Sequence, residues 1–284
     1  MLYYFLYRLG QFIAVSLPLG LGYRLAVFFS DIHYIFAYQD RMRVTQNLQA
    51  IFPQKNEKEI ARIRIRMFRN FAKYLVDFFR FQDLDAGFVE KNIKFENLEY
   101  LDAALKKNRG VIAVTAHIGN WELAGVAVSL KGYPIWAVAL SHKNKNVNDF
   151  FIRQRENKKV KVIPFGNAAR TCLKALRLNH LVALVGDRDF SEKGPVIDFF
   201  AKPSIFPEGP AVLALKTKAP VIPGFMIRNS DDTFTLRFEK PVECEITGNK
   251  TEDINKIIAS YKDIFEKYIR TYPDQWFMFR KFWA

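Results

Sequence analysis

Residues 111–125 form the stretch that most constrains the fold of this 284-residue chain. The stretch opens with an apolar, β-branched run, Val111–Val114, which is typical of a buried strand. Apolar residues then recur at helical spacing over Trp121–Leu130, so a helix is expected there. Between the two, Gly119 permits a tight turn and Asn120 can cap the helix. The sequence therefore predicts a strand, a turn and a helix in immediate succession.

Two polar residues, His117 and Glu122, stand on either side of this turn. His117 is expected at the carboxyl end of the strand, which is where ligands bind in open α/β sheets. Glu122 is expected in the first turn of the helix that follows. A histidine close to a carboxylate is typical of an oriented general base, so this pair is the first candidate for a catalytic site.

Beyond this unit, strand-like and helix-like segments alternate along the chain. The expected strands are Ile93–Asn97, Ile135–Leu140, Val160–Pro164, Leu181–Val185 and Val221–Ile227. The expected helices are Leu98–Lys107, Asn148–Lys159, Ala168–Arg177, Ala211–Lys218 and Glu252–Tyr272. The remaining segments are a turn at Ser191–Gly194, a strand or flap at Val196–Phe200 and an antiparallel edge strand at Thr233–Glu239. The alternation predicts an α/β fold with a mixed, largely parallel sheet flanked by helices.

Residues 1–39 are expected to anchor the chain at a membrane surface. Leu9–Tyr23 is uncharged, but it is shorter than the roughly twenty apolar residues of a transmembrane helix. Aromatic side chains that suit the headgroup region recur here: Tyr3, Tyr4, Phe5, Tyr7, Phe12, Phe28 and Phe29. Two alternatives remain open, a helical hairpin buried against the core and a single N-terminal span.

Residues 40–284 are expected to form a single catalytic domain with a helical lead-in over about 40–92. The lead-in comprises a short helix at Asp40–Phe52 and a long amphipathic helix at Glu57–Phe81. One side of the long helix is basic: Arg62, Arg66, Arg69, Lys73 and Arg80. Such a stripe is either a solvated face or a surface that faces a membrane. The aromatic and basic end of the chain, Trp276–Trp283, also suits a membrane interface.

The composition favours a surface that is both basic and apolar. The chain carries a formal net charge of +14 and 27 phenylalanines. An anionic membrane attracts basic segments by about 1 kcal/mol per Lys or Arg near its surface. Nucleic acid would use the charge equally well, but it would not require aromatic ends. Cys172 and Cys244 are too few and too far apart for a disulfide framework, so a reducing, cytosol-facing location is expected.

Motifs of several common enzyme classes are missing from the sequence. There is no Gly-x-Ser-x-Gly elbow of a serine hydrolase and no Gly-x-x-x-x-Gly-Lys-Ser/Thr phosphate loop. No cluster of metal ligands accompanies His117 and Glu122, so neither a metal nor another cofactor is expected.

The four-residue gap between His117 and Glu122 is similar to the His-x-x-x-x-Asp/Glu signature of the glycerolipid and lysophospholipid acyltransferase superfamily. The wider block Ala116–Gly125 resembles the branch that contains the lipid A lauroyl/myristoyl acyltransferases and the phosphatidylinositol mannoside acyltransferases. Further blocks similar to this branch are Asn47-Leu48, Phe52-Pro53, Asp187–Ser191, Phe199-Phe200 and Pro207–Ala214. The resemblance therefore covers nearly the whole chain.

The resemblance implies an acyltransferase at the cytoplasmic face of the bacterial inner membrane. The acyl donor would be acyl carrier protein or acyl-CoA, and the acceptor a hydroxyl of an anionic glycolipid or lysophospholipid. A lipid A-type precursor is preferred over a mannosylated inositol lipid. His117 would take the hydroxyl proton, Glu122 would orient its imidazole, and N–H groups at the helix start by Asn120 would stabilise the oxyanion. The rivals are a nucleic-acid-binding protein and an inactive scaffold.

Further residues are implied in binding. The guanidinium of Arg188 suits a phosphate of the acceptor or of the donor's pantetheine, with a structural ion pair as the alternative. Glu208 resembles the superfamily's Phe-Pro-Glu-Gly element, which implies acceptor positioning, unless it caps a helix. Arg155 and Asp187 are additional candidates for substrate binding. An acyl-chain groove is expected along three aromatic residues that core packing would explain equally well: Phe199, Phe200 and Phe206.

Overall fold

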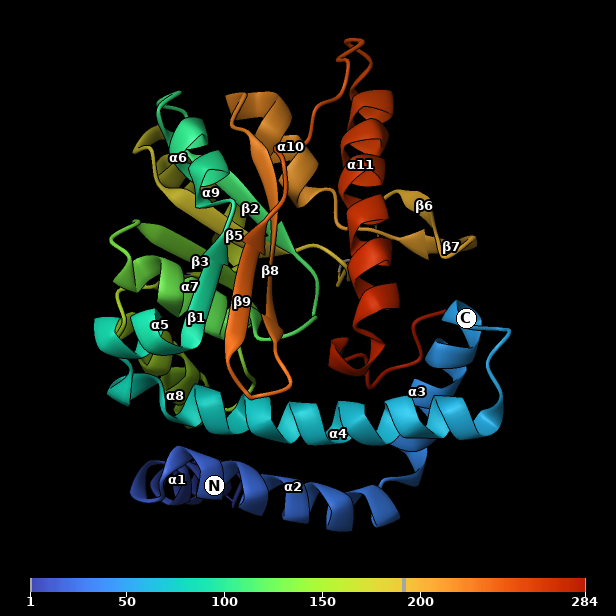
Figure 1. Ribbon diagram of the computed structural model, residues 1–284. Coiled ribbons are helices and arrows are strands. Elements are labelled where there is room, and N and C mark those ends of the chain that lie inside the picture. Colours follow the sequence, from blue (N-terminus) through green and yellow to red (C-terminus); the bar gives the residue numbers. More distant parts are fainter. Residues whose placement is uncertain (1, 191–192, 284) are drawn as a thin grey trace.

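The computed structural model describes residues 2–190 and 193–283, and within these residues seven strands form one sheet (Figure 1). Across the sheet the order is β1 (Ile93–Glu96), β9 (Phe234–Phe238), β8 (Val221–Arg228), β2 (Val111–Thr115), β5 (Leu181–Val185), β3 (Ile135–Ala139) and β4 (Lys161–Pro164). Neighbouring strands are parallel except for β8 and β9, which are antiparallel. The mixed, largely parallel sheet predicted from the sequence is confirmed.

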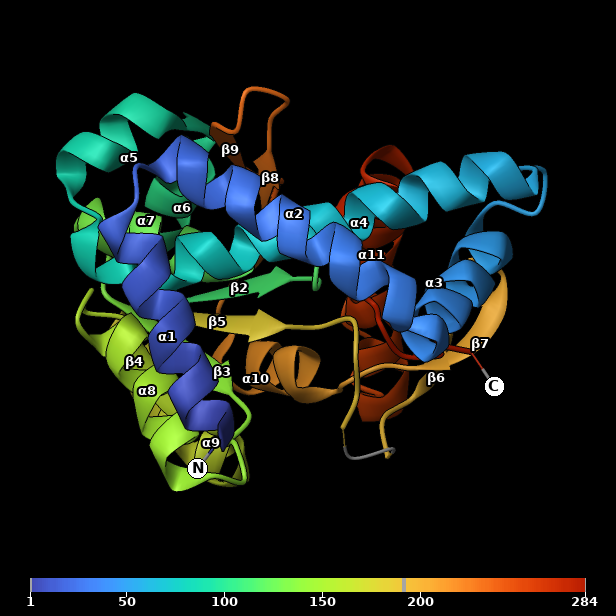
Figure 2. The same cartoon turned by 90° about the horizontal axis from the view of Figure 1, so that it is seen from below.

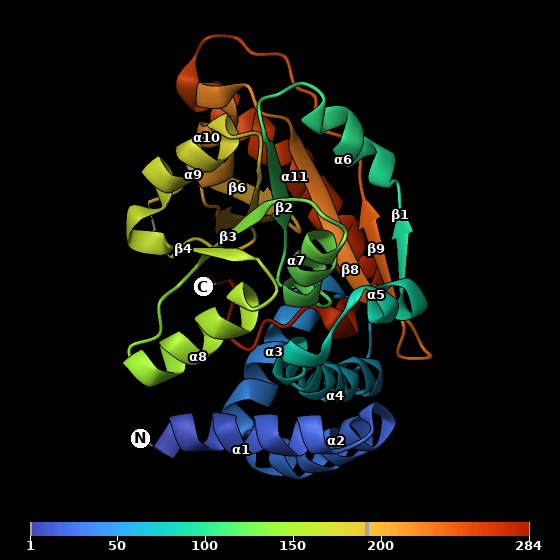
Figure 3. The ribbon, with the colours of Figure 1, turned by 90° about the vertical axis from the view of Figure 1, so that its left-hand side faces the viewer.

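Helices cover both faces of this sheet, which Figure 3 shows from the β4 side. One face carries α9 (Ala168–Arg177), α10 (Gly209–Thr217) and α11 (Lys250–Thr271). The other carries α5 (Ala86–Asn92), α6 (Leu98–Leu105), α7 (Trp121–Leu130) and α8 (Lys145–Glu156). Both helical layers are needed to bury the central strand β2, because Ile112 and Val114 are buried in one core and Val111 in the other. The 3₁₀ segments are η1 (Phe81–Asp83), η2 (Phe165–Asn167) and η3 (Pro273–Gln275).

A small antiparallel hairpin lies beside α11 (Figure 1). It consists of β6 (Val196–Phe199) and β7 (Lys202–Ile205). The sequence predicted the first of these strands, as a strand or flap, but neither β7 nor α5. The turn predicted at Ser191–Gly194 includes residues 191 and 192, which lie outside the described residues.

The N-terminal helices form a layer across one end of the strands (Figures 1 and 3). They are α1 (Leu2–Ser16), α2 (Leu19–Phe36), α3 (Tyr38–Ile51) and α4 (Glu57–Phe79). Figures 1 and 2 show α4 next to the sheet, with α1 and α2 outside it. The start of α4 is fixed by a capping box, in which Asn56 and Glu59 each accept a hydrogen bond from the other's backbone N–H. The two helices predicted at Asp40–Phe52 and Glu57–Phe81 are thereby confirmed, with ends within two residues of the expected ones.

The outer side of α1 and α2 is apolar and exposed. The inner side packs on α4 through residues such as Tyr7 and Tyr23. The exposed apolar side chains are Tyr3, Phe5, Leu6, Leu9, Phe12, Leu21, Phe28, Phe29, Ile32, Ile35 and Phe36. Across residues 2–190 and 193–283, no helix has the length and hydropathy that a membrane span needs. The interfacial anchor stays a prediction.

The basic stripe of α4 is partly engaged within the molecule, although Arg62, Arg66 and Arg69 are exposed, so the membrane-facing surface stays a prediction. Most of its cations have partners within the molecule, and these partners lie on α1, the residue after it, α2, the β8–β9 turn and η3. The contacts join Arg69 to Asp31 (2.7 and 2.8 Å), Lys73 to Asp232 (2.7 and 2.8 Å), Arg66 to Asp274 (3.2 Å) and Arg80 to the carbonyls of Ala14 and Leu17 (2.5 and 2.7 Å).

Candidate active site

The carboxyl ends of two neighbouring strands, β2 and β5, bring two polar residues together. The register of these strands pairs Thr115 with Val185, and each is the last residue of its strand. His117 follows β2 by two residues, and Asp187 follows β5 by two. Because parallel neighbours end at the same edge of a sheet, the two side chains meet there.

The imidazole of His117 and the carboxylate of Asp187 form a hydrogen-bonded pair. Nδ1 of His117 lies 2.6 Å from Oδ1 of Asp187, and the backbone N–H of His117 donates to Oδ2 at 3.0 Å. The indole N–H of Trp276 donates to the same Oδ2, also at 3.0 Å. An ionised carboxylate only accepts, so Nδ1 carries the proton and Nε2 keeps a lone pair. Nε2 is therefore the ring nitrogen that can take a proton from a substrate.

Asp187 is ionised although it is completely buried. Burial raises the pKa of its carboxyl, but the charge of His117 and the hydrogen bonds from His117 and Trp276 outweigh this effect. The resulting pKa lies below the ordinary value of 3.8. The carboxylate is thus held in the form that stabilises a positively charged imidazole.

A glycine turn sets the direction of the chain between His117 and α7. Gly119 has a φ of +63°, and a Cβ atom at this position would lie 1.8 Å from the carbonyl oxygen of Met226. The N–H of Gly119 donates to the carbonyl of Gln275 at 2.9 Å, and that of Asn120 to the carbonyl of Met226 at 2.8 Å. The tight turn predicted at Gly119 is confirmed.

The C-terminal tail supports this turn from the other side. The N–H of Phe277 donates to the carbonyl of His117 at 2.8 Å, and Ile118 pairs with Trp276 in an antiparallel bridge. Trp276, Phe277 and Met278 are buried. The membrane-interface role expected for the aromatic tail is therefore wrong for these residues, because their side chains fill the space beside the His117 turn.

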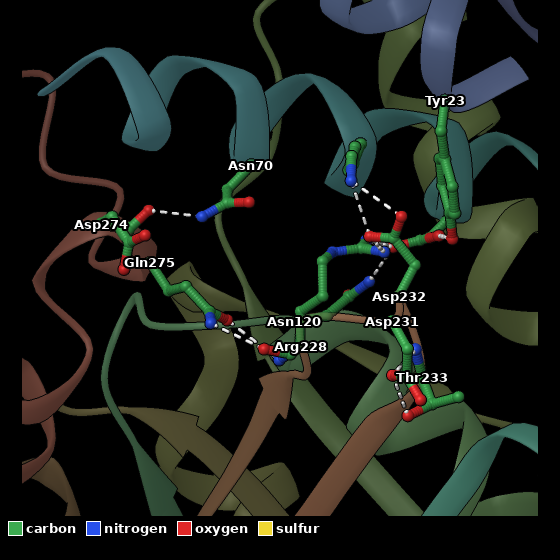
Figure 4. A network of polar contacts seen from close by, with 11 residues as sticks. Tyr23, Asn70, Asn120, Arg228, Asp231, Asp232, Thr233, Asp274 and Gln275 are labelled. Atoms are coloured by element: carbon green, nitrogen blue, oxygen red, sulfur yellow. Dashed lines mark hydrogen bonds and ion pairs between the residues drawn. The ribbon is translucent and has the colours of Figure 1, made fainter. Parts of the chain in front are cut away.

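Asn120 caps α7, as predicted, and is tied to a buried polar network (Figure 4). Its Oδ1 accepts the N–H of Leu123 at 3.0 Å, and its Nδ2 donates to Oδ2 of Asp77 at 2.7 Å. Asp77 also accepts from the Tyr23 hydroxyl at 2.5 Å and from the Arg228 guanidinium. Asn120 is 2% exposed, and both polar atoms of its side chain are engaged by hydrogen bonds within the protein.

Glu122 faces a different partner from the one predicted. Its two carboxylate oxygens accept a bidentate pair of hydrogen bonds from Arg155 on α8, at 2.7 and 2.6 Å. The guanidinium carbon of Arg155 also lies 5.8 Å from the ring centre of Phe78 and 6.0 Å from that of Phe151. The sequence assigned the contact with His117 to Glu122, and the structure gives that contact to Asp187.

A cavity of about 600 Å³ opens beside His117. Its walls are mainly small and aliphatic side chains, among them Ala113, Ala124, Val128, Ile135, Leu173 and Ala183. Polar residues predicted for the site also border it, namely His117, Glu122, Arg155, Arg188 and Glu208. Polar groups around one apolar space suit a ligand with a reactive end and a hydrocarbon body.

Two of these polar residues lie on loops. Arg188 directly follows Asp187, is partly buried, and forms no ion pair with any residue that the structure describes. The ion pair left open as an alternative for Arg188 is thus absent from the described residues. Glu208 precedes α10 and is exposed, and its side chain makes no capping hydrogen bond, so the capping alternative is also not observed.

The three phenylalanines expected to line an acyl-chain groove lie elsewhere. Phe199, Phe200 and Phe206 are not among the described residues that border the cavity. They are buried in an aromatic cluster with Trp276 and Trp283, where ring centres lie between 4.5 and 6.4 Å apart. The core-packing alternative accounts for them, because the hairpin and the tail each bring aromatic side chains to the same place.

Sequence reasoning gave Trp276, Asp77 and Arg228 no role in the site. Trp276 stood within an aromatic run that was assigned to the membrane. Asp77 is the one acid on the buried side of an otherwise apolar helix turn, Val76–Phe79, which was a usable signal of a buried polar contact. Among residues 2–190 and 193–283, no three His, Cys, Asp or Glu side chains gather as metal ligands would.

Comparison with known proteins gives a consistent result. The sequence model of a family described as bacterial lipid A biosynthesis acyltransferase matches residues 1–284. A phosphatidylinositol mannoside acyltransferase of Mycolicibacterium smegmatis is 28% identical over 218 residues, which are 75% of this chain and 70% of the relative. A lipid A biosynthesis palmitoleoyltransferase of Escherichia coli is 28% identical over 233 residues, 81% of this chain and 74% of the relative. A lipid A biosynthesis acyltransferase of Haemophilus influenzae is 22% identical over 241 residues, 84% and 74% respectively.

Proposed function

The chain belongs to the bacterial lipid A biosynthesis acyltransferase family, and from this premise we propose that it moves a fatty acyl chain from an acyl thioester to a hydroxyl of a phosphate-bearing glycolipid. The donor is acyl carrier protein or acyl-CoA. The acceptor is a lipid A-type precursor, in keeping with the family and with two of the relatives above. A mannosylated inositol lipid is the second candidate, because the mycobacterial relative acts in that class by its name. A lysophospholipid remains a further alternative.

The observation that carries this proposal is the His117–Asp187 pair beside an apolar cavity. Nδ1–H of His117 is held by Asp187, so Nε2 is free to act as a general base. Asp187 thereby takes the orienting role that the sequence assigned to Glu122. Glu122, neutralised by Arg155, acts as part of the cavity wall.

The reaction then needs no covalent enzyme intermediate. Nε2 of His117 accepts the proton of the acceptor hydroxyl as its oxygen bonds to the thioester carbonyl carbon. The carbon–sulfur bond breaks when the tetrahedral oxyanion collapses, and the leaving thiolate takes the proton from the imidazolium. Asp187 stabilises the imidazolium between these two steps. General-base assistance of this kind contributes about a hundred- to ten-thousand-fold.

Backbone N–H groups at the start of α7 are proposed to stabilise the oxyanion. The N–H of Asn120 donates to Met226, and the N–H of Leu123 donates to the Asn120 side chain. The role therefore falls to the N–H groups of Trp121 and Glu122, the first two residues of the helix.

Replacement of the base tests the proposed activity. His117→Ala should lower acyl transfer from a radiolabelled acyl thioester to lipid by at least about a hundred-fold, because the general base is lost. His33→Ala, at an exposed histidine of α2, is the matched control and should retain wild-type turnover. Near-normal transfer by the His117 variant would contradict the assignment. Mass spectrometry of membrane lipids from cells with and without the gene would identify the acceptor.

We further propose that α1 and α2 dock on the cytoplasmic face of the inner membrane without crossing it. The exposed aromatic side chains of this pair support the proposal. Phe5→Ser with Phe12→Ser should weaken partition into anionic vesicles at least ten-fold, since a buried Phe contributes about 1.5–3 kcal/mol. Leu178→Ser, at an exposed apolar residue after α9, is the control. Equal partition of both variants would contradict this docking face.

A further inference from the structure

Two arginines meet on one aromatic ring next to the candidate site. The guanidinium carbon of Arg188 lies 5.6 Å from the ring centre of Phe190, and that of Arg280 lies 5.9 Å from the same centre. Arg188 comes from the loop after β5, and Arg280 comes from the C-terminal tail. Arg188 borders the cavity that His117 borders. The two cations are therefore brought together close to the reacting groups by segments far apart in sequence.

Neither guanidinium has a carboxylate partner among the residues that the structure describes. The neighbouring Asp187 directs its oxygens at His117 and Trp276. Arg188 instead donates to the sulfur of Met278 at 2.7 Å, and a thioether is a weak acceptor. Burial lowers the pKa of Arg188, and the charge of Arg280 lowers it further against the opposing effect of Asp187. A phosphate at this position would supply the charged hydrogen-bond acceptor that both guanidinium groups lack among the described residues.

The backbone that carries Arg280 is held firmly. Asn47, on α3, is 2% exposed and its side chain bridges three groups of the tail. Its Nδ2 donates to the carbonyls of Met278 and Arg280 at 3.1 and 2.6 Å, and its Oδ1 accepts the N–H of Phe282 at 2.9 Å. Because both polar atoms of this buried amide form hydrogen bonds to one segment, they hold that segment in place. The backbone of Arg280 is thus held in place by α3, while the residue itself is exposed to solvent.

We infer that Arg188 and Arg280, each within 6 Å of the ring centre of Phe190, form a phosphate clamp that binds a phosphate ester of one substrate while its reactive group lies at His117. Guanidinium groups bind phosphate oxygens through paired, charge-assisted hydrogen bonds, and the ring keeps both groups beside the cavity. The inference rests on the proposed function, which supplies two phosphate-bearing reactants. The phosphate belongs either to the pantetheine arm of the donor or to the acceptor lipid.

Truncated substrates distinguish the two sources. The first comparison uses an acyl-4′-phosphopantetheine and the matching acyl-pantetheine as donors, and the second a phosphorylated acceptor glycolipid and its dephosphorylated form. In wild type, the KM of one phosphate-free substrate should exceed the KM of its phosphorylated counterpart by about ten- to a hundred-fold, as expected for lost charge-assisted hydrogen bonds. In Arg280→Ala and Arg188→Ala this ratio of KM values should fall toward one. The arm in which it falls identifies the source of the phosphate.

A matched control and a turnover-free measurement complete the test. Lys281→Ala removes an exposed cation next to Arg280 and should keep the wild-type ratio. Dissociation constants measured at equilibrium report phosphate binding by the clamp without any acyl transfer. The compounds compared are 4′-phosphopantetheine with pantetheine, and glucose 1-phosphate with glucose. If neither phosphate compound binds Arg280→Ala more weakly than it binds wild type, the clamp is overturned. If these differences appear but wild-type protein transfers no acyl group, the clamp stands and the proposed function fails.

Discussion

Asp187 and Glu122, the two carboxylates beside the candidate site, are held in opposite ways. Asp187 is fully buried and accepts hydrogen bonds from the imidazole and backbone of His117 and from Trp276. Glu122 is paired through both oxygens with Arg155, and about 14% of its side chain is exposed. One carboxylate is coupled to a group that can gain and lose a proton, and the other to a guanidinium that keeps its charge at all working pH values.

This difference predicts a catalytic effect for Asp187 and a structural one for Glu122. A carboxylate on an imidazole stabilises the imidazolium when it forms, so its effect appears in the transition state. A carboxylate already neutralised by a fixed cation gains little when a proton moves nearby. The Glu122–Arg155 pair joins α7 to α8 and borders the cavity, and we propose that its role is structural.

The largest expected effect comes from removing the charge of Asp187. Asp187→Asn keeps the size of the side chain but no longer favours a proton on Nδ1 or stabilises the imidazolium, so kcat should fall by about a hundred- to ten-thousand-fold. Steady-state kinetics with a labelled acyl thioester measure this change. Asp198→Asn, at an exposed position of β6, is the matched control. A near-normal kcat of Asp187→Asn would show that another residue, not Asp187, orients His117.

Breaking the second pair should act mainly on stability. Removing one partner of a buried ion pair costs about 3–5 kcal/mol, and somewhat less is expected for Glu122→Gln or Arg155→Met because both side chains are partly exposed. The double variant should lose less than the sum of the two, since neither charge is then left unpaired. The free energies of unfolding in urea of wild type, the two single variants and the double variant complete this double-mutant cycle. If Glu122→Gln unfolds like wild type yet lowers kcat as much as Asp187→Asn, Glu122 takes part in the chemistry after all.

Local patterns were sufficient for much of the fold. The strand Leu181–Val185 and the helices Trp121–Leu130 and Ala168–Arg177 have the bounds that periodicity predicted. The turn at Gly119 and the cap at Asn120 were also predictable, because both follow from the chemistry of a single residue type.

The identity of the partner of His117 was not predictable from local sequence. Glu122 lies five residues away along the chain and Asp187 seventy, so a spacing argument favours the nearer acid. What decides the contact is that β2 and β5 are neighbours in the sheet, and strand order is a property of the whole chain. The burial of Trp276 has the same origin, since an aromatic and basic run has one composition whether it meets lipid or the protein's own core.

The smallest expected effect is a pH dependence of stability that belongs to Asp187. Its pKa is lowered in the folded state, so its ionised form contributes stability above the ordinary value of 3.8, and this contribution is lost as the pH falls through the lower folded value. The difference in free energy of unfolding between wild type and Asp187→Asn should therefore shrink below about pH 4, by at most about 1.4 kcal/mol per pH unit. Urea titrations down to the lowest pH at which the fold persists measure it. Ile163→Val, in the apolar core, should show a pH-independent difference. A difference for Asp187→Asn that is equally flat would mean that Asp187 is not held as a carboxylate, and the contrast with Glu122 would lose its electrostatic basis.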